Sequence, residues 1–387
     1  MKKRMTISLG WLLILCMLLS VCTASAQPIQ NRQPWLYGAE ETDGDVILAG
    51  HRGYHVTAKE NTVAAFLAAA EAGFSWVELD IRVTGDGVMV LSHNDEVNMY
   101  DHGAPVHFIF YHSNYDDVKD YTWDEEGKYP LATLPEALEA LKPLDMTIIF
   151  DLKYGRREDA FQAAIDAGLE DRIYLSFGST ESAMSWADIL KQHSTTGVRL
   201  IPTDYAGTKL LMETLPNPII ADVNAKLVLR DDTHKLALSN SLAANLPMMM
   251  SGCDWNNQAV WSVVPGGVMA NDELNLTVDQ FREALTYDKT APCTLEAAVM
   301  QGELKIGEQV ISGVKSDRTD AAGYIYVYSK DPTIVTIRQQ TFGNDASFLA
   351  EGIAPGTTEI RAFTGTGAFV DIPVTVLNQI AEPTEGA

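Results

Sequence analysis

Short apolar runs alternate with amphipathic stretches over the first two thirds of the chain. The runs have the length of β-strands and lie at residues 46–50, 75–81, 146–152, 172–176, 197–201, 218–222, 246–250 and 266–270. Helical periodicity marks residues 63–72, 134–141, 160–169, 182–192, 234–246 and 278–285. For the sixth strand, residues 225–229 compete with 218–222. Eight strand–helix units predict an α/β fold, a (β/α)8 TIM barrel, over residues 45–290.

The pattern changes after Tyr287. Helical periodicity ends, and apolar and polar residues alternate at 324–328, 334–337, 358–363 and 369–377, separated by turn residues. Alternation with period two is typical of strands that bury one face. Residues 292–378 are therefore predicted to form a small all-β sandwich, followed by a polar tail at 379–387.

The first residues have the pattern of a cleavable signal peptide. Three basic residues precede an apolar run at 11–21, and small residues follow up to Ala26. The run is shorter than the roughly 20 residues of a spanning helix, so we favour cleavage over a retained membrane anchor. We expect a signal peptide at 1–26, a flexible lead-in at 27–44, and a bacterial protein that is secreted, periplasmic or bound to the cell surface. Because of Cys22, a lipoprotein remains an alternative to soluble secretion.

The net charge of the chain limits the kinds of partner that it can bind. The chain has 52 acidic and 28 basic residues and a formal net charge of −24, and loss of the three basic residues at 2–4 would lower it to −27. Such a chain repels nucleic acids and anionic membranes, which we exclude as partners held by charge alone. After cleavage, only Cys253 and Cys293 would remain, at opposite ends of the predicted barrel, and we expect two free thiols.

Acidic residues come together at the ends of two predicted strands. Glu78 and Asp80 are two positions apart, so their side chains point to the same face of one strand, while Val77, Leu79 and Ile81 point to the other. Carboxylates held together favour a hard divalent cation between them. Asp151, at the end of the next barrel strand, would complete a set of three ligands.

Basic residues occupy neighbouring strand ends. His51 and Arg52 follow the first strand, His93 follows an apolar run at 87–91, and Lys153 lies two residues beyond Asp151. Histidine both accepts and donates protons near neutral pH, and arginine grips phosphate oxygens. Two histidines at strand ends beside three carboxylates favour a catalytic pair over a set of structural histidines.

The order of these motifs resembles the glycerophosphodiester phosphodiesterase family. The resemblance covers about residues 46–290 and rests on five motifs. They are His51-Arg52-Gly53, Glu60-Asn61-Thr62, Glu78-Leu79-Asp80, Thr84-Gly85-Asp86-Gly87 and His93, with further matches at 133–138 and 176–177.

The resemblance implies a hydrolase that needs a divalent metal, Ca²⁺ or Mg²⁺, and releases glycerol 3-phosphate and an alcohol from a glycerophosphodiester. It implies Glu78, Asp80 and Asp151 as metal ligands, and His51 and His93 as the catalytic pair. We assign His51 as base and His93 as acid, and the reverse remains open. Arg52, Glu60 and Lys153 are expected to bind the substrate and its phosphate.

Departures from the family pattern leave parts of the site open. The family usually has glutamate where Asp151 stands, and the segments at 252–256 and 270–273 match its final motifs poorly. The metal's identity and the headgroup preference therefore stay undetermined. The long segment at 94–130 is expected to be a loop that shapes the site, with His102, His107 and His112 as loop residues.

Residues 292–378 resemble a bacterial immunoglobulin-like domain of group 2, which implies a spacer or adhesive module with a cell-surface or wall ligand. Two other functions remain open. One is a phosphodiesterase for a larger surface polymer such as teichoic acid. The other is a surface-binding protein whose barrel has weakened activity. The sequence does not give the oligomeric state.

Overall fold

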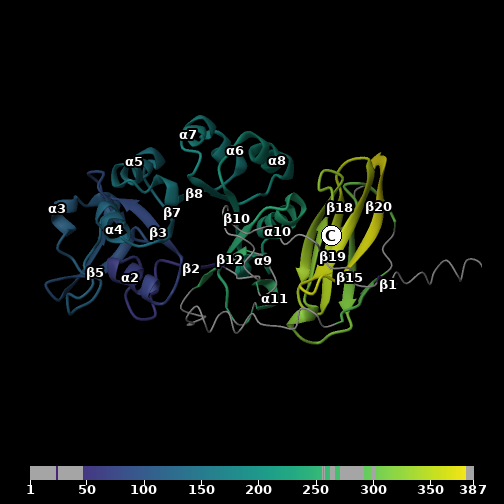
Figure 1. The fold of residues 1–387 in the computed structure, drawn as a ribbon, viewed down its shortest axis with the longest axis horizontal. Helices are drawn as coiled ribbons and strands as arrows, with labels where there is room; N and C mark the ends of the chain where they lie inside the picture. Colours follow the sequence, from purple (N-terminus) through teal and green to yellow (C-terminus); the bar gives the residue numbers. More distant parts are fainter. Residues whose placement is uncertain are drawn as a thin grey trace, which may run out of the picture. The chain divides into compact units, whose positions relative to one another are not determined.

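The computed structural model describes residues 23–24, 47–254, 256, 258–261, 266–270, 292–298 and 302–380. The chain divides into two compact units (Figure 1), Asn31–Thr286 and Met1–Gln30 with Tyr287–Ala387. The predicted lead-in at 27–44 and the predicted helix at 278–285 lie outside the described residues, as do most of the predicted signal peptide and of the polar tail.

Eight parallel strands form the barrel of the first unit. Each pairs with the next along the chain, and the last also pairs with the first, so the ring closes. The strands are β2 (Ile47–Gly50), β3 (Trp76–Val83), β7 (Thr147–Leu152), β8 (Ile173–Phe177), β9 (Gly197–Leu200), β10 (Ile219–Asn224), β11 (Met248–Ser251) and β12 (Gly266–Ala270). The eight predicted strands and the TIM-barrel-like fold are therefore confirmed.

Helices connect these strands (Figure 1). They are α2 (Val63–Glu71), α4 (Leu134–Leu141), α5 (Arg157–Ala167), α6 (Thr180–Met184), α7 (Ala187–Gln192), α8 (Tyr205–Thr214), α9 (Ala225–Val228), α10 (Asp232–Ala244) and α11 (Gln258–Trp261). The run at 225–229 that competed for a strand forms α9, because the Asn224 side chain accepts hydrogen bonds from the next backbone N–H groups.

The sequence predicted one helix at 182–192, but the structure has two short helices there, α6 and α7. Trp186 lies at the break, where its buried ring packs against Phe161 and Phe177. Burial of this ring stabilises the break against the helical preference of its neighbours. Helix α8 was not predicted, since it contains Gly207 and buries only Thr208 and Leu211.

The barrel interior has an apolar layer beneath a polar one. Its buried cluster consists of Ala49, Trp76, Ile149, Tyr174, Ile220 and Met249. Side chains two positions further along a strand share the same face. Glu78 follows Trp76 in this way, Asp151 follows Ile149, and Asp222 follows Ile220. The carboxylates therefore lie above the apolar layer, at the carboxyl ends of the strands.

The segment at 94–130 is more ordered than the predicted loop. It contains the hairpin of β5 (Glu96–Asp101) and β6 (Ala104–Ile109), the 3-10 turn η1 (Phe110–His112) and helix α3 (Tyr115–Val118). Its residues Val97, Met99, Phe110 and Val118 form a buried cluster together with Val90 of the strand Met89–Leu91 and with Leu131. We call residues 94–130 the inserted segment.

We predicted that all three histidines of the inserted segment lie in loops, and this is only partly correct. His102 lies in the turn of the hairpin, whereas His107 lies on β6 and pairs with Glu96 of β5, with 2.9 Å between imidazole Nε2 and carboxylate Oε1. His112 ends the 3-10 turn. All side chains of β6 are at least partly exposed, so apolar and polar residues do not alternate clearly there and no strand was predicted.

The second unit consists of two β-sheets. One has the order β1-β13-β15-β18-β17 and the other the order β14-β20-β19-β16. The strands are β1 (Thr23–Ala24), β13 (Leu295–Ala297), β14 (Glu303–Ile306), β15 (Gln309–Ser316), β16 (Ile325–Ser329), β17 (Val335–Thr341), β18 (Asp345–Gly352), β19 (Gly356–Thr364) and β20 (Phe369–Ile380). A single apolar cluster includes residues of both sheets. Strand β1, within the predicted signal peptide, pairs with β13.

Two further predictions concern thiols and membranes. Cys253 and Cys293 are both buried and free, as predicted. Within the described part of the chain, none of the helices has the length and hydrophobic character needed to cross a membrane.

Candidate active site

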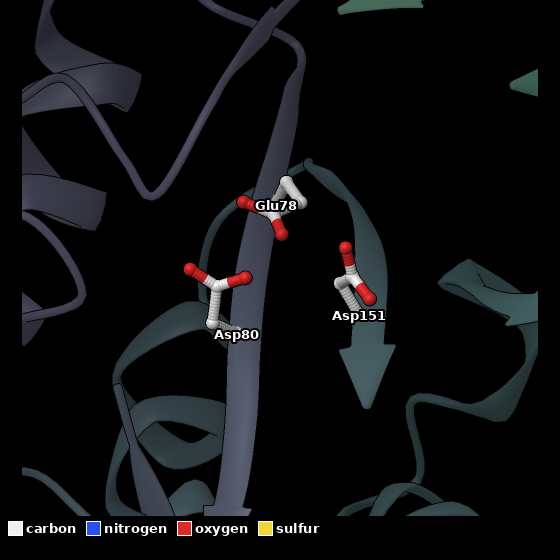
Figure 2. Close-up of side chains that lie close together, drawn as sticks. All are labelled: Glu78, Asp80 and Asp151. Atoms are coloured by element: carbon white, nitrogen blue, oxygen red, sulfur yellow. The ribbon is translucent and has the colours of Figure 1, made fainter. Parts of the chain in front are cut away.

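Three carboxylates meet where β3 and β7 run side by side (Figure 2). Asp80 and Asp151 are partners in the parallel register of these strands, and Glu78 precedes Asp80 on the same face of β3. Each of the three offers an oxygen, and these oxygens lie within 4.8 Å of one another. Glu78 and Asp80 are almost fully buried. The structure thus brings together the three predicted metal ligands.

Burial and mutual repulsion shape the protonation of this cluster. Burial, together with the negative charges of Asp80 and Asp151, raises the pKa of Glu78 well above its usual range. Burial also acts to raise the pKa of Asp80, but Lys153 and Arg52 outweigh it, and the pKa of Asp80 is lowered. Asp80 is therefore ionised, whereas Glu78 needs a proton or another cation beside it.

Arg52 holds the turn after β2 against the cluster. Its backbone N–H donates to Glu78 Oε2 at 2.9 Å, and its guanidinium contacts Asp80 Oδ2 and Glu60 Oε2, each at 3.0 Å. Arg52 has a left-handed φ of 59° and Gly53 a φ of 85°. A Cβ on Gly53 would lie 2.6 Å from the carbonyl carbon of Ala65, so only glycine lets this turn pack on α2.

Asn61 positions Asp80 and was not among the predicted site residues. Its side-chain amide donates to Asp80 Oδ2 at 2.8 Å, and its Oδ1 accepts from the Asp80 backbone N–H at 3.0 Å. The residue is buried with a φ of 55°, a conformation that asparagine tolerates better than most residues. The following residue, Thr62, caps α2. Asn61 is part of the Glu60-Asn61-Thr62 motif, so the sequence pointed to it, but we assigned no function to the asparagine.

Lys153 connects the two strands of the cluster. Its Nζ lies 3.0 Å from Asp80 Oδ1 and 2.8 Å from Asp151 Oδ2. Its backbone N–H donates to the Ile81 carbonyl at 2.9 Å, which fixes the chain just beyond the end of β7. The predicted cation thus lies at the cluster.

Arg199 and Asp222 extend the charged layer across the barrel and were also missed. Arg199 Nη2 lies 2.8 Å from Asp222 Oδ1, and its Nη1 lies 3.1 Å from Ser176 Oγ and 4.0 Å from Asp151 Oδ2. Arg199 is almost fully buried. Arg199 and Asp222 each interrupt an apolar strand run. This interruption is the signal in the sequence that marks them as groups of the barrel interior.

The two histidines lie on separate turns. His51 directly follows β2 and is half-buried, and burial together with the charge of Arg52 lowers the pKa of its imidazole to about 3. Its ring is therefore neutral at physiological pH and is a weaker base than a free imidazole. His93 follows β4 (Met89–Leu91), and the guanidinium of Arg82 donates twice to its carbonyl, at 2.9 and 2.7 Å. The catalytic roles of both histidines stay predictions.

The cluster fits a hard divalent cation. Glu78 Oε1 is buried and has no hydrogen-bond partner among the residues that the structure describes. In the charged layer, five carboxylates and three cationic side chains leave a formal charge of −2 when all are ionised. The carboxylates are Glu60, Glu78, Asp80, Asp151 and Asp222, and the cations are Arg52, Lys153 and Arg199. Oxygen donors and this charge suit Ca²⁺ or Mg²⁺.

Residues 51–190 match the model of the Glycerophosphoryl diester phosphodiesterase family. These residues are similar to that family, and the match covers about a third of the chain. The matched range contains the three carboxylates, both histidines and Lys153, but it is shorter than the predicted resemblance over 46–290. The poorly matching segments at 252–256 and 270–273 lie beyond it.

Two curated relatives of the family domain illustrate the similarity. One is a glycerophosphodiester phosphodiesterase of Caldanaerobacter subterraneus, 27% identical over 149 residues, which cover 34% of this chain and 57% of the relative. The other is glycerophosphodiester phosphodiesterase 1 of Mus musculus, 35% identical over 123 residues, which cover 28% of this chain and 34% of the relative. The chain thus spans 57% and 34% of the lengths of these two relatives.

Solved structures also resemble the chain. A phosphodiesterase of Oleispira antarctica, in complex with the product sn-glycerol-3-phosphate, matches 61% of this chain and 96% of its own, with 18% identity and a TM-score of 0.47. A glycerophosphodiester phosphodiesterase of Agrobacterium tumefaciens matches 60% and 99%, with 19% identity and a TM-score of 0.45.

Proposed function

We propose that the chain hydrolyses glycerophosphodiesters to glycerol 3-phosphate and an alcohol, with a divalent metal cation as cofactor. The observation that carries the proposal is the cluster of Glu78, Asp80 and Asp151, whose oxygens lie within 4.8 Å of one another beside Lys153 and Arg52. The cluster lies inside the range that matches the phosphodiesterase family.

The residues around the cluster divide the work of the reaction. The three carboxylates would hold the metal, and Arg52 and Lys153 would hold the phosphate oxygens by charge-assisted hydrogen bonds. Glu60, through its contact with the Arg52 guanidinium, would keep that guanidinium oriented. When bound, Ca²⁺ or Mg²⁺ supplies positive charge that stabilises the transition state and makes the glycerol hydroxyl more acidic.

The two histidines would move the protons. His51, neutral because its pKa is lowered, accepts the proton of the glycerol hydroxyl next to the diester as that oxygen bonds to phosphorus. His93 donates a proton to the alcohol oxygen as its bond to phosphorus breaks. Water then opens the cyclic phosphate, with the proton roles reversed, and leaves glycerol 3-phosphate.

The assay that tests this proposal uses the purified full chain and glycerophosphocholine, with and without Ca²⁺ or Mg²⁺. We expect glycerol 3-phosphate only when the metal is present. The variants His51→Ala and His93→Ala should release none while unfolding at the temperature of the parent protein. Cleavage of a teichoic acid but of no small diester would instead select the larger polymer as substrate.

We also propose that the chain is a secreted bacterial protein with a C-terminal module that binds a cell-surface or wall ligand. The basic and apolar pattern of residues 1–26 and the two β-sheets that share one apolar cluster support this. The module would be immunoglobulin-like. N-terminal sequencing of the protein from culture medium should start at Gln27, and pull-down with purified cell walls should require residues 292–378.

A further inference from the structure

An exposed aromatic pair includes Tyr154, the residue that directly follows Lys153. Tyr111 of η1 and Tyr154, which follows β7, have ring centroids 5.0 Å apart and meet edge to face at 78°. They are 49% and 48% exposed, although most large apolar and aromatic side chains of this unit are buried. Nothing in the proposed proton transfers or metal binding uses them.

The chain fixes both rings next to site residues. Tyr154 is the neighbour of Lys153, and both backbone N–H groups donate to the Ile81 carbonyl, at 3.4 and 2.9 Å. On the other side, Asp95 lies two residues beyond His93. Its Oδ1 accepts from the Tyr111 backbone N–H at 3.2 Å, and its carbonyl accepts from Phe110 N–H at 3.0 Å. The pair is thus tied to the segment that carries the proposed acid.

The 3-10 turn that carries Tyr111 is docked closely on the β3–β4 connection. The Gly85 N–H donates to the carbonyls of Phe110 and Ser113, at 3.1 and 2.8 Å. A Cβ on Gly85 would lie 2.8 Å from the Tyr111 carbonyl oxygen. The backbone N–H of Tyr115 also donates to Asp86 at 3.0 Å. The ring of Tyr111 is therefore carried by a backbone anchored at several points.

The chemistry of this place suits a cation. Aromatic faces are electron-rich and attract ammonium groups, most of all quaternary ones, which make no hydrogen bonds. A hydrogen bond to Tyr111 raises the pKa of the Tyr154 phenol, and so does the negative charge of Asp95, which also attracts cations. A chain of formal net charge −24 favours cations further.

We infer that Tyr111, Tyr154 and Asp95 form a subsite for the cationic ammonium headgroup of the alcohol that leaves. The inference rests on the proposed function and specifies its substrate class, choline or another quaternary amine. His93 protonates the leaving oxygen, so the headgroup that this oxygen carries extends toward the residues that follow His93. The subsite selects substrates and takes no part in the proton transfers.

The test compares two diesters that differ only in the headgroup charge. Glycerophosphocholine has a quaternary amine, whereas glycerophosphoglycerol has a neutral polyol. For the full chain with Mg²⁺ or Ca²⁺, the ratio of kcat/KM for the two substrates should fall about tenfold in Tyr154→Leu and Tyr111→Leu. Tyr154→Phe keeps the ring and should stay within about twofold of the parent.

Two further variants separate recognition from simple packing. Gly85→Ala retains both rings but displaces the turn that carries Tyr111, so it should lower the same ratio. Leu210→Ala removes an exposed apolar side chain from α8 and should leave both rates unchanged. Equal losses on both substrates in the leucine variants, or an unchanged ratio, would overturn the subsite.

A binding measurement keeps the subsite and the proposed function separately testable. Ligand-observed NMR with choline chloride, against lithium chloride at equal ionic strength, should show binding to the parent and to Tyr154→Phe but not to Tyr154→Leu. If neither diester is cleaved and choline still binds in this pattern, the proposed function fails and the subsite stands. If both diesters are cleaved and choline binds all variants alike, only the subsite fails.

Discussion

Lys153 forms an ion pair with Asp80, with 3.0 Å between Nζ and Oδ1. The same ammonium lies 2.8 Å from Asp151, so it neutralises part of the charge that would hold a metal. It also offers a positive charge to the phosphate. Lys153 should therefore weaken binding of the metal and strengthen binding of the phosphate. A substitution of Lys153 tests both effects at once.

Lys153→Gln should bind the divalent cation more tightly and the substrate less well. We expect half-maximal activity at a lower metal concentration, because one competing cation is gone, and a kcat/KM about 10- to 100-fold lower, because a charged phosphate contact is lost. Titration of activity with Mg²⁺ and Ca²⁺ measures both. Arg156→Gln removes a largely exposed cation nearby and serves as the matched control. Weaker metal binding in Lys153→Gln would contradict this division of roles.

Asn61 should act on the metal through Asp80. Asn61→Gly removes both hydrogen bonds to Asp80 while it keeps the left-handed φ, so the metal concentration for half-maximal activity should rise about tenfold. Asn61→Ala should show the same rise and, in addition, a loss of about 1 kcal/mol in the free energy of unfolding from the strained φ. Metal titration and thermal unfolding of the two variants, compared with each other, separate the two effects.

Gly53 should be irreplaceable for a steric reason. In Gly53→Ala the new methyl carbon would lie 2.6 Å from backbone of α2, and the φ of 85° disfavours any side chain. The free energy of unfolding should fall by about 1–3 kcal/mol, together with activity, since the turn carries His51 and Arg52. Gly178→Ala meets no atom within 4 Å and should change stability by less than about 0.5 kcal/mol. Equal stability of the two variants in denaturant titrations would refute the steric account.

Asp371 should make part of the second unit acid-sensitive. Burial acts to raise its pKa, but hydrogen bonds from Arg361, at 2.8 Å to each oxygen, and from Lys330, at 2.7 Å, outweigh it, and the pKa is lowered. The contribution of the ionised Asp371 to the free energy of unfolding is therefore complete above the unfolded-state pKa of about 3.9. It is lost as the pH falls through the pKa of Asp371 in the folded state, which is lower.

Asp371→Asn should remove this stabilisation at neutral pH, by about 1 kcal/mol given the partial exposure of the groups, and should make little difference in strong acid. Hydrogen exchange of peptides from β16, β19 and β20 in the full chain, measured across pH, tests it. Arg318 and Asp320 form a pair on an exposed turn, and Asp320→Asn provides the control with a much smaller effect. Identical exchange in parent and Asp371→Asn at neutral pH would show that the contacts add no stability.

Most barrel strands could be predicted because they are largely buried on both faces, as β3, β8, β9 and β11 are, and therefore read as apolar runs. Glu78, Asp80 and Asp151 could be found for a related reason, since strand geometry fixes which side chains share a face. Arg199 and Asp222 carried the same kind of signal but were not recognised, because an ion pair between adjacent strands needs a register that the sequence alone does not give. Their contact exists only once β9 and β10 are paired in this register.

Other features depend on tertiary packing. The break between α6 and α7 follows from the burial of Trp186, and the hairpin of the inserted segment follows from a cluster whose members lie on several short elements. In the second unit, β15 and β18 pair along most of their length, yet neither was predicted. Glycine and charged residues at their ends hide the alternation of buried side chains in both strands.

The inserted segment has a consequence for how such a protein can change. Its side chains pack in an apolar cluster that also contains Val90 of β4 and Leu131, and its carbonyls at Phe110 and Ser113 accept hydrogen bonds from the Gly85 N–H. Replacing residues 96–121 with a graft from a relative would therefore exchange Tyr111 and its turn while the charged residues of the barrel, all outside this range, are kept. The proposed choice of alcohol and the proposed cleavage of the phosphodiester can thus change independently of each other.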